Sequence, residues 1–341
     1  MYASNVPSAD NANTGPAAIE PSPRMSAAEL GAMWSGYVPG LALIPPKDPR
    51  STAFRLFWTR GNENGFRDFP LGAGQHLIVG RHTRCDVVLP SDGDLSLRHL
   101  LVVPEGGAEP KLRLVDLRAA MPMYAMTDRP ARSLSVDGPF AVRLGTYMLG
   151  GFPVGPGTEP PPAALPSMES IESASASEAA KRRPSTQLGH DEGPYRTARR
   201  STLITALPRP ITLVEASDAP SKGAIVATLL GKRAGQTARV ALREEDLRRG
   251  VLVGRAEKCM DQGLKQVMTM QISRVHAVVL LDARNTVWLY DAGSTNGTLV
   301  TGTKVRSATL AELPSPSGPF VARSHAVLGD GIEVELEGPA S

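Results

Sequence analysis

The stretch QISRVHAVVL, residues 271–280, joins a polar start to a run of apolar side chains. The apolar half, from Ala277 onward, is typical of a short buried strand. A hydroxyl, a guanidinium and an imidazole stand directly before it, at Ser273, Arg274 and His276. A strand that is otherwise suited to a protein core therefore begins with groups suited to a polar ligand.

Short strand-like runs of this kind fill two parts of the chain, 51–155 and 211–341. Their length and spacing, with turn residues between them, predict an all-β sandwich or barrel in each part. In the second part only 242–249 has helical character, and it could equally be a charged loop; a short helix is also possible at 26–34. Residues 1–50 and 156–210 are rich in Pro, Ala and Ser and poor in large apolar side chains. We therefore expect a disordered N-terminal tail and a disordered linker that tethers the two halves flexibly.

The two strand-rich halves repeat each other. The matching segments are LIVGRHTRC (77–85) with VLVGRAEKC (251–259), SLRH (96–99) with SRVH (273–276), and LRLVD (112–116) with VWLYD (287–291). The spacings between them drift by only a few residues, as loop insertions would cause. The pattern indicates a duplicated domain.

Charge and cysteine content exclude several classes of protein. The chain has 37 basic and 34 acidic residues, a net charge of +3, so no large field attracts nucleic acid or a membrane surface. Cys85 and Cys259 are too few for a disulfide framework or a zinc cluster, and we expect both in a core. No stretch is long and apolar enough to span a bilayer, and the N-terminus lacks a secretory signal. We expect a cytoplasmic protein without a metal or cofactor.

The polar groups of the second half fall at strand ends, in Gly254-Arg255, Ser273-Arg274, His276 and GSTNGT (293–298). Loops of a sandwich gather at its poles, so these groups can converge. Two guanidiniums with hydroxyls and an amide suit a dianion such as a phosphorylated side chain. Hydrolysis by His276 or Asp291 is a weaker hypothesis, because no nucleophile and base lie at suitable spacing.

The elements GR, SRVH and STNG, in this order and at strand ends, resemble the forkhead-associated (FHA) family over most of residues 222–338. Asn296-Gly297 alone indicates no more than a hairpin turn, but the three elements together are specific. The resemblance implies an eleven-strand β-sandwich whose loops at one pole bind phosphothreonine peptides.

The resemblance also implies roles for individual residues. Arg255 would contact the phosphate or the peptide backbone, and Arg274 would add charge. Ser273 and Thr295 would bind the phosphate, and Asn296 would hold the peptide main chain. The residues expected to shape the loops are Gly254, His276 and Gly297. Lys258 and Lys265, in the loop between Arg255 and Ser273, would extend the positive surface.

The first half departs from the pattern. Gly80-Arg81, Ser96 and His99 are present, but Leu97 stands where the second half has Arg274. AAMPM (119–123) replaces STNGT, so the Thr and the Asn are missing. We expect this domain to keep the fold and to bind phosphothreonine weakly or not at all.

The sequence thus predicts a non-enzymatic adaptor in Ser/Thr kinase signalling whose partner is a phosphothreonine protein, such as a kinase or its substrate. The alternative is a phosphate-independent scaffold that uses the FHA-like folds for docking or dimerisation. Ser185 and Thr202 follow arginines in the linker and resemble kinase sites, and Thr186 and Thr202 are the candidate phosphothreonines. If phosphorylated, they would present an intramolecular ligand at high effective concentration.

Overall fold

The computed structural model describes residues 51–60, 63–107, 110–125, 130–155, 212–215, 223–257, 259, 262–314, 319–329 and 331–339. The predicted N-terminal tail and linker, with Thr186 and Thr202, lie outside the described residues, as does Lys258.

The first domain is a sandwich made from one sheet that doubles back on itself. Its strands are β1 (Ala53–Arg60), β2 (Glu63–Pro70), β3 (Leu77–Gly80), β4 (Val87–Val88), β5 (Leu100–Pro104), β6 (Leu112–Asp116), β7 (Met123–Ala125), β8 (Pro130–Val136), β9 (Phe140–Leu144) and β10 (Tyr147–Val154). They run in the order β2-β1-β10-β9-β7-β8-β6-β5-β3-β4. Side chains of β1, β9 and β10 share a core with those of β3, β5 and β6, because alternate residues of each strand point inward.

A strand from beyond the linker completes this sheet. β11 (Thr212–Glu215) pairs antiparallel with β8 of the first domain. The sequence prediction placed these residues at the start of the second domain, whereas the structure places them on the first. The reason is that a free strand pairs with whichever sheet edge it meets, and a four-residue strand does not reveal its partner in its sequence.

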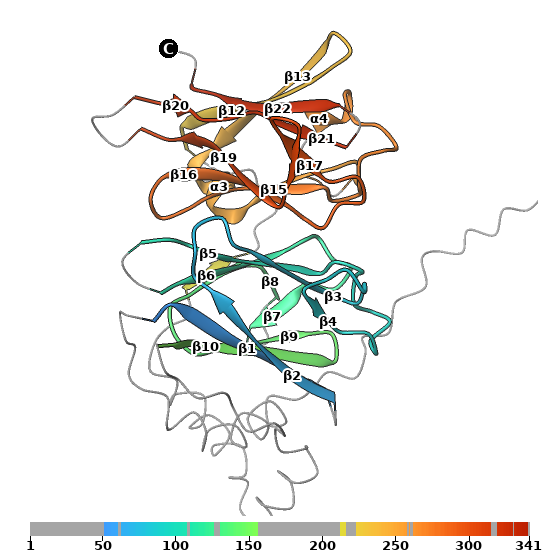
Figure 1. The fold of residues 1–341 in the computed structure, drawn as a ribbon, viewed down its shortest axis with the longest axis vertical. Coiled ribbons are helices and arrows are strands. Elements are labelled where there is room, and N and C mark those ends of the chain that lie inside the picture. Colours follow the sequence, from blue (N-terminus) through green and yellow to red (C-terminus); the bar gives the residue numbers. More distant parts are fainter. Residues whose placement is uncertain are drawn as a thin grey trace, which may run out of the picture.

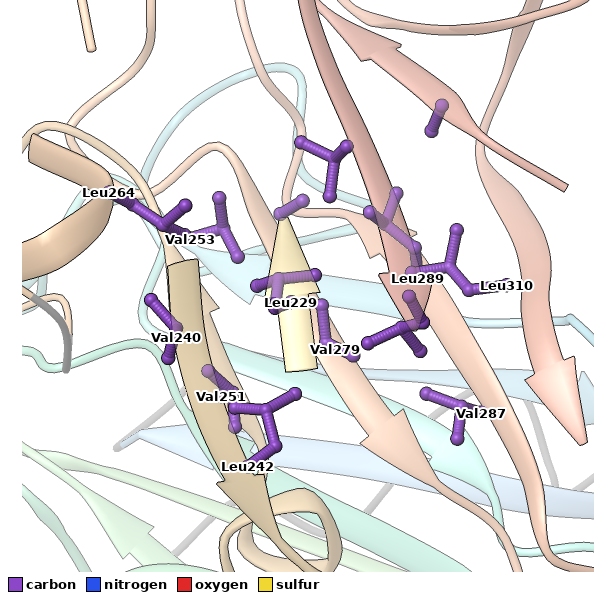
Figure 2. Close-up of a cluster of buried hydrophobic side chains, with 14 of the residues drawn as sticks. Leu229, Val240, Leu242, Val251, Val253, Leu264, Val279, Val287, Leu289 and Leu310 are labelled. Atoms are coloured by element: carbon purple, nitrogen blue, oxygen red, sulfur yellow. The ribbon is translucent and has the colours of Figure 1, made fainter. Parts of the chain in front are cut away.

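The second domain is a sandwich of two sheets. Its strands are β12 (Ile225–Arg233), β13 (Gln236–Arg243), β14 (Val251–Val253), β15 (Ala277–Leu281), β16 (Thr286–Asp291), β17 (Thr298–Val300), β18 (Thr303–Val305), β19 (Ser307–Glu312), β20 (Val321–Ala322), β21 (Ala326–Leu328) and β22 (Ile332–Glu337). One sheet has the order β13-β12-β22-β21-β17-β18 and the other β14-β15-β16-β19-β20. Figure 2 shows leucine and valine side chains from both sheets meeting in the core. The predicted all-β fold of about eleven strands in each half is confirmed.

Two short helices lie among these strands, α3 (Glu244–Arg249) and α4 (Gln262–Lys265). The first falls in the segment that has helical character in the sequence. It carries the i,i+4 ion pairs Glu244–Arg248 and Glu245–Arg249.

The two domains pack directly on each other, with β5 and β6 of one facing α3 and β15 of the other (Figure 1). On β15, Val279 and Leu281 point into the domain's own core, while Val278 and Leu280 join a cluster shared with the first domain. Free movement of two tethered domains, expected from the linker, is therefore not what the structure shows. The physical reason is that strands buried on both faces need apolar residues at consecutive positions, and these strands have them.

The shared cluster uses equivalent residues of the two repeats. Its members form the pairs Ile78 and Leu252, Cys85 and Cys259, Leu101 and Val278, Val103 and Leu280, Val115 and Tyr290, and Leu117 and Ala292. The same face of each copy is thus buried, as in the self-complementary interface of a symmetric dimer.

Polar contacts surround this cluster. The Ala283 amide donates to the carbonyl oxygen of Glu105 at 2.8 Å, and the Arg306 guanidinium pairs with the Asp86 carboxylate at 2.6 Å. His76 donates from Nε2 to the carbonyl oxygen of Asp291 at 3.1 Å. An apolar centre with satisfied polar groups around it holds the domains in one arrangement.

Candidate functional site

The end of β14 passes unusually close to the residues that precede β15. The Arg255 amide donates to the Ser273 carbonyl at 3.2 Å, and the His276 amide donates to the Val253 carbonyl at 2.8 Å. A Cβ on Gly254 would overlap the carbonyl oxygen of Arg274 and lie 2.9 Å from the Cα of Val275. Only glycine permits this approach, which brings the GR and SRVH elements together.

His276 links these elements to the turn that follows β16. Its side chain is fully buried, Nε2 donates to the Gly297 carbonyl at 3.0 Å, and Nδ1 accepts from the Ser273 amide at 3.4 Å. Burial lowers the pKa of His276, against the opposing effect of Asp291, so the imidazole is neutral at neutral pH. One nitrogen donates and the other accepts, as a neutral imidazole requires.

The Asp291 carboxylate organises the turn itself. It accepts from the Ser294 amide at 2.6 Å, from the Ser294 hydroxyl at 2.7 Å and from the Thr298 hydroxyl at 2.8 Å. The Ser294 oxygen in turn accepts from the Gly297 amide at 2.9 Å, and Gly297 adopts a φ of +87°. These bonds leave Thr295 and Asn296 exposed at the tip of the turn.

The sequence prediction considered Asp291 only as a weak candidate for hydrolysis and missed its role in the turn. The signal was a carboxylate three residues before a serine, a spacing that is typical of side-chain to backbone bonds in turns.

The predicted site residues lie at one pole of the second domain. The Thr295 amide donates to the Ser273 hydroxyl at 3.1 Å. Asn296 donates from its side-chain amide to the carbonyl oxygen of Gln271 at 2.8 Å, a partner that the sequence did not indicate. Ser273 is half-buried, whereas Arg255 and Arg274 are exposed beside it. The backbone of Arg255, the hydroxyl of Ser273 and the tip of the turn therefore lie together, next to two exposed arginines.

Lys304 adds a further cation to this surface. Its aliphatic stem lies over Gly297, where an added Cβ would meet it. Lys304 is exposed on β18, which pairs with the strand that follows the turn. Strand pairing brings it to the site, and neither its spacing nor its neighbours in the sequence signal this. Lys265, which the sequence prediction placed on the surface, is half-buried on α4.

The first domain keeps the backbone framework of this pole. The His99 amide donates to the Val79 carbonyl at 2.8 Å, and the Ser96 amide to His99 Nδ1 at 3.4 Å, as in the second domain. A Cβ on Gly80 would lie 2.5 Å from the carbonyl oxygen of Leu97, so this glycine is needed for the same reason as Gly254.

The polar groups at the equivalent pole of the first domain either bond within that domain or are absent from its sequence. Arg81 donates from Nε to the Leu95 carbonyl at 2.7 Å. His99 Nε2 is buried and has no hydrogen-bond partner among the described residues, and burial lowers the pKa of His99 to about 4. Asp116, equivalent to Asp291, accepts from the Ala119 amide and from Arg132 instead of hydroxyls. This pole keeps the backbone framework and lacks counterparts of Thr295 and Asn296.

Neither cysteine belongs to a reactive site. The thiols of Cys85 and Cys259 donate to the carbonyls of Leu97 and Arg274, at 3.2 and 3.1 Å. Burial raises the pKa of both thiols to about 11, which leaves them protonated. Across the described part of the chain, no three His, Cys, Asp or Glu side chains are grouped as a metal site would need. Within that part, no helix is long and apolar enough to cross a membrane.

Comparison with known proteins finds one family model that matches part of the second domain. Residues 251–317, which contain all the groups described at its pole, match the family model of the FHA domain. Over these residues the chain is similar to an FHA domain. No curated protein sequence matched the chain.

Solved FHA structures also match. FHA-1 of Rv1747 from Mycobacterium tuberculosis is 19% identical, over 30% of this chain and 97% of that one, with a TM-score of 0.24. An FHA domain from an Arabidopsis thaliana hypothetical protein is 20% identical, over 34% and 97%, with a TM-score of 0.28. The yeast Dun1 FHA domain, solved with a doubly phosphorylated peptide from Rad53, is 20% identical, over 37% and 86%, with a TM-score of 0.27.

Proposed function

We propose that this protein is a non-enzymatic adaptor whose FHA domain binds phosphothreonine in a partner protein. The observation that carries the proposal is the convergence of Arg255, Ser273, Thr295 and Asn296 on one surface, with the hydroxyl of Ser273 bonded to the backbone of Thr295. This surface presents positive charge and hydroxyl donors, and the side chains that form it make no reactive pair.

Each group has a place in this proposal. Arg255 and Arg274 pair with the phosphate, and the hydroxyls of Ser273 and Thr295 donate to its oxygens. Asn296 exchanges its bond to Gln271 for one to the peptide main chain. Charge-assisted hydrogen bonds are worth about 1.5–3 kcal/mol each, so three or four of them, less the cost of ordering the peptide, suit micromolar affinity.

The kinase pathway follows from the ligand. Phosphothreonine is the product of a Ser/Thr kinase, so the partner is such a kinase or one of its substrates. The linker residues Thr186 and Thr202 are candidate ligands of the same kind within this chain. Both lie close to the FHA domain in sequence, and tethering would raise their effective concentration to the millimolar range.

A phosphate-independent scaffold is the second candidate, and one observation favours it. The outer face of the FHA domain already buries Val278 and Leu280 against a second copy of the same fold. This fold therefore supports docking that needs no phosphate. Partners that remain bound after a lysate is treated with phosphatase would favour the scaffold function.

The test of the adaptor is fluorescence polarisation of the full chain against a degenerate phosphothreonine peptide library, with phosphoserine and unmodified libraries as controls. We expect binding of the phosphothreonine library alone, and its loss in the double variant Ser273→Ala with Asn296→Ala. Equal binding of modified and unmodified libraries would reject the proposal.

A further inference from the structure

The first domain carries an arginine in an unexpected place. Leu97 and Arg98 are equivalent to Arg274 and Val275 of the second domain. In the second domain the arginine is exposed, and Val275 packs against the shared apolar cluster. In the first domain the order is reversed, so that Leu97 is 51% exposed and Arg98 is half-buried at the position next to the interface.

Burial alone would favour the opposite order. Burying a leucine side chain stabilises a protein, whereas withdrawing a guanidinium from water is costly. The first domain therefore gives up stability at this pair of residues. A charged group in a costly position is a candidate for function.

Arg98 lies against the phosphate-binding turn of the other domain. A Cβ on Gly293 would lie 3.1 Å from Nε and 3.4 Å from Cδ of Arg98. Gly293 has a φ of +73° and stands two residues before Thr295. The guanidinium is thus within about 10 Å of the tip of the turn, since each residue spans at most about 3.6 Å.

The guanidinium of Arg98 is also uncommitted. Among the described residues it forms no hydrogen bond or ion pair, in contrast to Arg81, which is bonded to the Leu95 carbonyl. Burial lowers the pKa of Arg98 and the nearby Asp291 carboxylate opposes this shift, so the group remains charged at neutral pH. Its donors are available to a ligand that lies across the domain boundary.

Resting on the proposed function, we propose that Arg98 completes a composite site, in which the first domain supplies a cation that binds an acidic or second phosphorylated side chain flanking the phosphothreonine. The first domain has lost its own site, yet it widens the site of its neighbour. The ligand class is therefore a phosphothreonine peptide with additional negative charge, because neutral flanking residues offer Arg98 no charged acceptor.

The test compares two peptides with the full chain at low ionic strength. One is a phosphothreonine flanked by three glutamates on each side, and the other has glutamines in their place. The variant is Arg98→Gln, and Arg60→Gln is the matched control, because Arg60 carries the same charge on the same domain, beside Glu63 and Tyr147. We expect Arg98→Gln to weaken binding of the glutamate peptide by about tenfold and to leave the glutamine peptide and the control unchanged.

Each other outcome overturns the inference. Equal weakening of both peptides would mean that Arg98 only supports the turn, and no weakening of either would mean that it has no role. If the parent chain binds neither peptide, the proposed function itself fails, which is a distinct result.

A second variant separates function from stability. The exchange Leu97→Arg with Arg98→Leu restores the order of the second domain. We expect this variant to unfold at a higher temperature than the parent and to lose its preference for the glutamate peptide. An exchange that lowers the unfolding temperature and keeps the preference would contradict the composite site.

Discussion

Replacing Asp291 by alanine should unfold the turn that follows β16 at a calculable cost in stability. The carboxylate accepts three hydrogen bonds at 2.6–2.8 Å, one from an amide and two from hydroxyls, and Asp291 is 7% exposed. Hydrogen bonds to a charged group contribute about 1.5–3 kcal/mol each. The hydroxyls can turn to other acceptors, but the Ser294 amide cannot. We therefore expect Asp291→Ala to lower the free energy of unfolding by about 3–5 kcal/mol.

The assay is urea unfolding followed by circular dichroism, together with titration of a phosphothreonine peptide under native conditions. Asp116→Ala is the matched control, since this carboxylate binds the Ala119 amide and Arg132 at the equivalent place in the first domain. Both variants should lose stability, and only Asp291→Ala should lose peptide affinity. Parental affinity in Asp291→Ala, or a stability loss below about 1 kcal/mol, would refute the reasoning.

Three further predictions concern the framework of the two domains and their interface. Gly254→Ala should lower the free energy of unfolding by about 2 kcal/mol or more, because the added Cβ meets backbone atoms of Arg274 that cannot move aside. Urea unfolding measures this loss, and an unchanged midpoint would contradict the prediction. Leu280→Ala should lower the free energy of unfolding by about 2–5 kcal/mol, although this side chain lies outside the core of its own domain. A thermal midpoint equal to that of the parent would show that the domains are not packed together. Burial lowers the pKa of His76 and that of His99 to about 4 in the folded chain, from an unfolded value of about 6.5. The stability that each neutral histidine contributes is therefore complete above pH 6.5 and is lost as the pH falls towards 4. Urea unfolding at pH 7 and pH 4.5 should therefore show a loss of about 2 kcal/mol for each histidine, and equal stability at the two values would be the contrary result.

The sequence predicts the fold and the pole of the site because both depend on local pattern. Strand length, turn residues and the elements around Gly254, Ser273 and Asn296 indicate a sandwich and its ligand-binding loops. Their convergence needs no more than the rule that loops of a sandwich gather at its ends.

The interface between the domains could not be predicted in the same way. An apolar run such as AVVLL, residues 277–281, looks the same whether its second face meets its own domain or another one. The outer face of β15 packs against the first domain, and only the tertiary structure shows this.

Single residues were missed where their partner is distant in sequence. Asp291 acts through the turn that follows it, and Lys304 reaches the site by strand pairing. No sequence pattern signals a role for Arg98, which lies just before β5. Its position against Gly293 depends on how the domains pack.

The most direct test of the proposed phosphate site uses the repeat itself. Arg255 and Arg81 occupy equivalent positions in the two domains and both are exposed, but Arg81 donates from Nε to the Leu95 carbonyl. Isothermal titration of the full chain with a phosphothreonine peptide should show a loss of at least about tenfold in affinity for Arg255→Ala and none for Arg81→Ala. Equal affinities of the parent and Arg255→Ala, or a loss confined to Arg81→Ala, would contradict the assignment of the site to the second domain.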